Sequence, residues 1–289
     1  MGLAFFQYST PIAHWSFTIY SIAGGLLFGA AASMNGGCTF STLTRLGDGD
    51  VNFAATVVGW PVGAWIVKII NLDASQIPTR LSSEQLIDTP LLYLAAAIAV
   101  VWLIWQMAVI LGRRPHRARP LQVLLSPTYK LSIAAALIAL FNLILFENFG
   151  PWSFTSVILS TVAPVHFPSV AALPIHWLVL GFTLAGIVVS SIQRKSFSLQ
   201  RPKFRRLAAH GAAGVAMGFG AAMIPGGNDS LILYGISSFS PHALPAFMGI
   251  LAGIALTFVG VKRLGGTPPR IQCSGDMCVT PIKPGVTLS

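Results

Sequence analysis

Charged residues are scarce in this sequence, since Asp, Glu, Lys and Arg make up only 9% of the 289 residues. A soluble globular domain carries about 25% charged residues, so this composition argues against a soluble protein. Hydrophobic residues account for 54% of the chain, and its mean hydropathy is +0.72. The composition therefore predicts an all-α polytopic membrane protein in which residues 1–289 form a single membrane domain in a lipid bilayer.

Cysteine is also rare, and the three present are too few for a disulfide scaffold. No spacing of His or Cys matches a metal-ligand pattern, so we expect neither a metal ion nor a cofactor. The N-terminal residues lack a basic stretch followed by a cleavage site, and we expect no removable signal peptide.

Apolar segments long enough to cross a bilayer of about 30 Å recur along the chain. We predict seven spans, at 16–35, 51–70, 91–111, 130–149, 174–193, 207–224 and 241–262. The stretch 150–173 is also apolar, but three prolines interrupt it. It is expected to be a re-entrant or surface-lying loop, because irregular backbone at membrane depth persists only against protein or a water-filled cavity.

The basic residues are distributed unevenly between the loops that connect these spans. If every span crosses, all Lys and Arg except Lys68 and Arg80 lie on one side of the membrane. Cytoplasmic loops carry such an excess, so this side is predicted to be cytoplasmic, together with the tail 263–289. The net charge of +10 then needs no nucleic-acid partner.

Two glycine pairs reveal an internal repeat. Gly36-Gly37-Cys38 and Gly226-Gly227-Asn228 each follow an apolar segment, and an offset of 190 residues aligns them. We predict a first repeat at 16–111, connecting spans and basic loops at 112–206, and second-repeat helices at 207–262. The span parity places Cys38 on the cytoplasmic side and Asn228 on the outer side, which predicts an inverted repeat with broken or re-entrant helices.

These breaks are the candidate substrate-binding site, at Gly36, Gly37, Cys38, Thr39, Gly226, Gly227 and Asn228. Adjacent glycines that end a helix leave N–H groups that an oxyanion could bind. The Cys38 thiol could donate a hydrogen bond or attack sulfur as a thiolate, although a buried cysteine is usually inert. Asp229 is expected to cap its own helix, with Asn228 offering an amide donor.

Three residues outside the breaks could each have a functional role or an ordinary structural one. Arg45 could guide an anion, or it could be a topology-fixing charge or a partner of Asp48. Cys273 and Cys278 are separated by four residues, unlike zinc or thioredoxin motifs. They could exchange sulfur with a partner or be ordinary tail residues.

The segment Gly36-Gly37-Cys38-Thr39-Phe40-Ser41, followed by residues 43–50, resembles the signature of the YeeE/YedE sulfur-transport family. The resemblance implies an all-helical inverted repeat with short re-entrant loops. It also implies thiosulfate uptake across the bacterial inner membrane along a path of cysteine thiols. Cys38 matches such a cysteine, whereas Asn228 stands where the second repeat would have one.

We therefore expect a transporter or channel for a small sulfur-containing anion, with thiosulfate as the leading candidate. No acidic residue within the membrane marks an evident proton or sodium site, which favours passive or channel-like movement. One alternative is a sulfur-transfer protein that carries persulfide on Cys38 or the tail pair and passes it to a cytoplasmic sulfur-carrier protein. Another is a non-transporting scaffold subunit that binds through the basic loops 112–130 and 194–206.

Overall fold

The computed structural model describes residues 14–70, 80–81, 97, 101, 104–105, 131–162, 174–266, 272–274 and 277–279. Its helices are α2 (Ile19–Asn35), α3 (Thr39–Gly47), η1 (Val51–Phe53), α4 (Ala54–Ile70), α8 (Leu131–Phe149), α9 (Phe154–Ser160), α10 (Pro174–Gln193), α11 (Phe204–Met223), α12 (Asn228–Ser230), the π-helical η3 (Leu231–Gly235) and α13 (Ala243–Arg263). Two short antiparallel pairs join β1 (His14–Trp15) to β2 (Arg80–Leu81) and β3 (Gln272–Ser274) to β4 (Met277–Val279). The predicted span 91–111 lies almost entirely outside the described residues.

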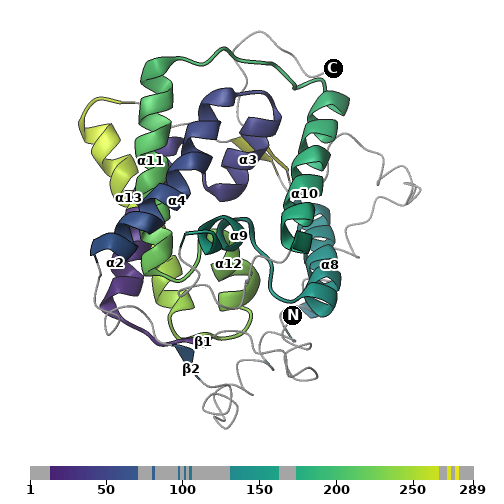
Figure 1. Cartoon of the computed structure of the whole chain (residues 1–289), viewed down its shortest axis with the longest axis vertical. Helices are drawn as coiled ribbons and strands as arrows, with labels where there is room; N and C mark the ends of the chain where they lie inside the picture. The colour runs from purple at the N-terminus through teal and green to yellow at the C-terminus, as the bar shows by residue number, and fades with distance from the viewer. Residues whose placement is uncertain are drawn as a thin grey trace.

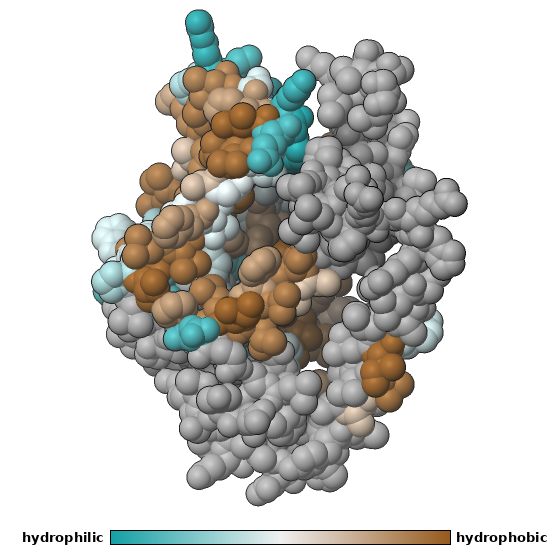
Figure 2. All heavy atoms as spheres, turned by 90° about the vertical axis from the view of Figure 1, so that its right-hand side faces the viewer, coloured by the Kyte–Doolittle hydropathy of each residue, from teal (hydrophilic) through white to brown (hydrophobic). Residues whose placement is uncertain are grey.

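The helices confirm an all-α membrane protein. In the described part of the chain, Val51–Ile70, Pro174–Gln193 and Ala243–Arg263 are each long and apolar enough to cross a membrane. A further candidate is α11 with the segment Asn228–Gly235, bent by 43° at the break between them. Large apolar side chains such as Phe182 and Leu256 are exposed, and hydrophobic residues cover much of the coloured surface in Figure 2. Such a surface suits contact with lipid.

Helices α2 and α13 lie in direct backbone contact. A Cβ added to Gly25 would stand 2.2 Å from the Ala246 carbonyl oxygen, and one added to Gly29 would stand 2.1 Å from the Ile250 carbonyl oxygen. Residue numbers rise together along both helices, so α2 and α13 run parallel. Only glycine permits this approach, as small residues do where membrane helices pack closely.

Helices α4 and α11 pack in the same way. A Cβ at Gly214 would meet the Thr56 carbonyl oxygen at 2.4 Å, and one at Gly218 would meet the Trp60 carbonyl oxygen at 2.0 Å. These helices are also parallel. Thr56 and Trp60 of α4 contact glycines of α11, just as Ala246 and Ile250 of α13 contact glycines of α2. The two pairs of contact residues differ in number by 190, the predicted offset.

Helices α2 and α11 join these two pairs and run antiparallel. Gly24, near the start of α2, lies against Gly220 and Met223 near the end of α11. Asn35, at the end of α2, instead contacts His210 near the start of α11. The short helices α3, α9 and α12 lie between this four-helix group and the helices α8 and α10 in Figure 1.

Candidate anion-binding site at two helix breaks

The two breaks share one backbone geometry. The Gly37 N–H donates to the Ala32 carbonyl at 2.9 Å, and the Gly226 N–H donates to the Ala221 carbonyl at 2.9 Å. Each is the 6→1 bond of a Schellman-type helix end. These bonds are related by an offset of 189, one residue short of the prediction, so Cys38 corresponds to Gly227 and Thr39 to Asn228.

This geometry corrects the predicted role of the glycines. The Gly36 N–H donates to the Ser33 carbonyl, so the N–H groups of Gly36, Gly37 and Gly226 are already satisfied. Donors for an anion must come from the next residues. Helix α3 begins at Thr39, its N-cap residue is Cys38, and no side chain caps it. The N–H groups of its first turn are the kind of group that binds anions at helix N-termini.

Asn35 holds the first break together. Its Nδ2 donates to the Gly37 carbonyl at 3.1 Å and to Thr42 Oγ1 at 2.9 Å. Its Oδ1 accepts from Thr56 Oγ1 at 2.7 Å and from His210 Nδ1 at 2.9 Å. The buried amide therefore uses both donors and both acceptor positions, and it ties the break to α3, α4 and α11.

The tips of the two breaks touch. Thr39 Oγ1 donates a hydrogen bond to Asn228 Oδ1, and both side chains are buried. The loops of Cys38 and Asn228 are predicted on opposite sides of the membrane, and their broken-helix tips are also expected to converge. The structure shows this convergence, because each segment turns back after its break until the two tips meet. Cys38 lies half-buried beside this contact, with its Sγ 3.8 Å from Ser41 Oγ.

A third short segment supports the meeting point. The carboxylate of Asp229, which is 0% exposed, accepts from Thr155 N–H at 2.9 Å and from Thr155 Oγ1 at 2.7 Å. Asp229 thus binds the first turn of α9, whose N-cap residue is Ser153, and backbone N–H groups of Asp229 and Ser230 in its own helix also face the carboxylate. A Cβ at Gly227 would stand 2.4 Å from Thr155 Oγ1, so only glycine fits between α12 and α9.

Helix α9 lies inside the protein. Every residue from Phe154 to Ser160 is buried, so the re-entrant reading of this region agrees with the structure and the surface-lying reading does not. Residues 163–173 of the predicted loop lie outside the described part. Tyr234 anchors the start of α9, since its hydroxyl accepts from Trp152 N–H at 2.9 Å and lies 2.7 Å from the Trp152 carbonyl oxygen and 2.9 Å from Asn142 Oδ1.

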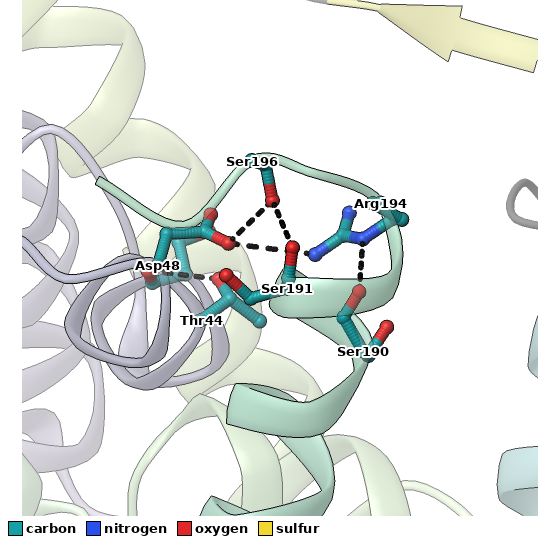
Figure 3. A network of polar contacts seen from close by, with 7 residues as sticks. Thr44, Asp48, Ser190, Ser191, Arg194 and Ser196 are labelled. Carbon is teal, nitrogen blue, oxygen red and sulfur yellow. Dashed lines mark hydrogen bonds and ion pairs between the residues drawn. The ribbon is translucent and has the colours of Figure 1, made fainter.

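Arg45 lies at the other end of α3. It is exposed, and its guanidinium lies 5.3 Å from the centre of the Phe53 ring. Asp48 instead pairs with Arg194 at 3.5 Å and accepts from Ser196 Oγ at 3.0 Å, as Figure 3 shows. Of the alternatives for Arg45, the pair with Asp48 is therefore not the one that the structure shows.

The tail cysteines lie at paired positions of two short strands. In the antiparallel pair of β3 and β4, Cys273 lies in register with Cys278. The structure therefore brings these two positions together.

Sequence reasoning missed Asn35, Asp229 and Thr155 as parts of this site. An asparagine that ends an apolar helix directly before Gly-Gly was a usable signal for Asn35. Asp229 was visible in the sequence but was assigned to an outer loop. Thr155 carried no signal, because its role depends on a contact across 74 residues.

Comparison with known proteins agrees with this geometry. Residues 1–256 match the model of a family described as sulphur transport. No curated protein matches the sequence. The family match extends over both breaks, α9 and most of α13. The chain therefore belongs to the sulphur transport (YeeE/YedE) family.

Proposed function

We propose that this protein carries a small sulfur-containing anion across the bacterial inner membrane, with thiosulfate as the leading candidate. The observation that carries the proposal is the buried contact between Thr39 and Asn228, where the tips of two broken helices meet. Transporters place substrate sites where discontinuous helices from two repeats converge near the middle of the bilayer. Membership of a sulphur transport family supplies the class of cargo.

The chemistry at this point suits an anion in transit. A bare dianion in hydrocarbon is prohibitively unfavourable, so neutral hydrogen-bond donors must replace its water. The thiol of Cys38, the amide of Asn228 and the first-turn N–H groups of α3 can supply them, and the hydroxyl of Thr39 can do so when the anion displaces its hydrogen bond to Asn228. Donors without a full positive charge hold the ion weakly enough for release. Gly36, Gly37, Gly226 and Gly227 shape the breaks and permit close packing.

We also propose that the two halves form an inverted repeat, 16–111 and 207–262. The antiparallel packing of α2 and α11 supports this, together with the matched hydrogen bonds at their ends. In this arrangement the basic loops and the tail face the cytoplasm. Arg45 then guides the ion at the cytoplasmic end of α3, and Cys273 with Cys278 can exchange sulfur with a cytoplasmic carrier protein.

Uptake of radiolabelled thiosulfate into proteoliposomes tests the proposal, with sulfate, sulfite and selenite as competitors. We expect thiosulfate to enter and Cys38→Ala to abolish uptake while the variant remains folded. The matched control is the double variant C273S/C278S, which keeps Cys38 and is expected to transport normally. Full uptake by Cys38→Ala would remove the thiol from the path.

Cys38→Ser separates hydrogen bonding from sulfur transfer. A serine hydroxyl can still donate to an anion but cannot carry persulfide. We expect this variant to retain part of the uptake, and the intact mass of the wild-type protein to stay unchanged after exposure to thiosulfate. An added sulfur atom on a cysteine, with no uptake by Cys38→Ser, would favour the sulfur-transfer alternative.

A further inference from the structure

Asp229 is a buried carboxyl group within the bent span formed by α11 and the segment Asn228–Gly235. Its carboxylate accepts hydrogen bonds from the N–H and the hydroxyl of Thr155, and backbone N–H groups of Asp229 and Ser230 also face it. In the described part of the chain, the ion pair that the structure shows is Arg194–Asp48, on the surface. The donors around Asp229 are therefore neutral, and its charge has no cationic partner there.

The elements packed against α12 offer little else that titrates. Helix α9 contains no titratable residue. On α3 the charged residue is Arg45, which is exposed and lies over Phe53 at the far end of that helix. On η3 the titratable residue is Tyr234, whose hydroxyl forms hydrogen bonds with Asn142 and Trp152.

The charged groups of α11 are also remote, because Arg205, Arg206 and His210 all lie in its first two turns, away from the break. The thiol of Cys38 precedes α3 beside the meeting point of the two breaks. A proton is thus the simplest species that neutralises Asp229.

The position of this carboxyl matters for the anion. Asp229 follows Asn228, whose side chain binds Thr39 at the meeting point. A negative charge there opposes the entry of a second negative charge, and the opposition is strong in a low-dielectric interior. Ionisable residues within membrane spans are costly, and they commonly mark proton relays or ion pathways.

We propose that Asp229 binds one proton when the anion enters and releases it on the cytoplasmic side, so that uptake is proton-coupled. This deepens the proposed function and rests on it. The proton comes from water on the outer side and converts the carboxylate to a neutral carboxyl group. This proposal replaces the expectation of passive movement, which depended on finding no evident proton or sodium site among the acidic residues.

Proteoliposomes with the membrane potential clamped at zero provide the test. With one proton per anion and an outside pH about one unit lower, wild-type protein is expected to accumulate labelled thiosulfate about tenfold. Asp229→Asn is expected to transport thiosulfate but to reach only equal concentrations inside and outside. The substitution preserves packing, since the amide can accept from Thr155 N–H and donate to Thr155 Oγ1.

Two further variants separate charge from structure. Thr155→Val disturbs the same contact but keeps the titrating group, so it is expected to respond to the pH gradient. Asp48→Asn removes a surface carboxylate and is expected to accumulate thiosulfate like wild type.

Three results would overturn the inference. The first is wild-type uptake that ignores the pH gradient, and the second is accumulation that follows a sodium gradient instead. The third is undiminished accumulation by Asp229→Asn. Absence of any thiosulfate uptake by the wild-type protein would instead overturn the proposed function, and the coupling with it.

Discussion

After the first break the chain forms the nine-residue helix α3, whereas after the second it forms three residues of α12 and the π-helical turn η3. Helix α3 ends at a polar turn held by the segment 196–200, where Ser198 N–H donates to the Asp48 carbonyl at 2.8 Å. The second break is held by α9, through Asp229 and Tyr234. The same backbone turn therefore serves two tasks: one side presents a thiol and hydroxyls, and the other buries a carboxyl group.

The largest contrast is expected between the two asparagines. Asn35→Ala removes four hydrogen bonds and leaves buried Thr42 and Thr56 and half-buried His210 without these bonds, which is expected to lower the free energy of unfolding by about 3 kcal/mol. Asn228→Ala loses the bond to Thr39 and is expected to cost about 1 kcal/mol while weakening thiosulfate uptake. Denaturant unfolding in detergent measures both. Equal losses would show that Asn35 is not the clamp of its break.

The next largest difference is expected between the stability costs of replacing one glycine in each break. Gly226 has φ +144°, where a Cβ would also stand 2.2 Å from Ser230 Oγ, and Gly226→Ala is expected to cost about 2–3 kcal/mol. Gly36 has φ +80°, and a Cβ there would make an ordinary contact at 3.6 Å with Arg45 Nη1, so Gly36→Ala is expected to cost about 1 kcal/mol. The melting temperatures of the two purified variants measure which substitution costs more stability. The reverse order would contradict the tighter geometry of the second break.

Removing the hydroxyl that anchors α9 is expected to reduce stability by a smaller amount. Tyr234→Phe removes the hydroxyl that binds Trp152 and Asn142, and a loss of about 1–2 kcal/mol is expected. Tyr20→Phe is the matched control, because the structure gives that hydroxyl no hydrogen bond to a described residue, and its stability is expected to stay unchanged. Protection of the α9 amides in hydrogen exchange reports the same event locally. Unchanged protection in Tyr234→Phe would mean that other contacts hold α9.

The smallest effect is expected at the turn after α3. Arg194→Ala breaks an ion pair whose side chains are 39% and 36% exposed, so the cost is expected to be below about 1 kcal/mol and to shrink as salt is added. Unfolding at low and high ionic strength checks this. A large loss that salt does not alter would indicate a role beyond the surface pair.

The sequence predicted the positions of the long helices and of the two breaks well, but it did not predict how far the segments after the breaks turn back into the protein. Apolar segment lengths predicted α2, α4, α8, α10, α11 and α13, because each buries or exposes a helix-length run of apolar residues. The glycine pairs predicted both breaks. Counting every segment as a full crossing then separated Cys38 from Asn228, since a linear pattern does not show that a chain turns back after a break.

Other contacts depended on partners far away in the chain. The role of Asp229 required Thr155, which lies in a proline-interrupted segment with no clear periodicity. The Asp48–Arg194 pair spans the two halves of the sequence, so the nearer Arg45 looked the better partner. The one-residue change in offset, from 189 at the breaks to 190 in α4 and α13, is likewise visible only in the hydrogen bonds and backbone contacts.

The glycine contacts also limit how the protein can move. Helix α2 of the first half is seated against α13 of the second, and α11 of the second half against α4 of the first, with backbone touching backbone. Rocking of one half as an independent body would have to break these backbone contacts. We therefore expect any change of access from one membrane face to the other to arise in the small helices at the centre.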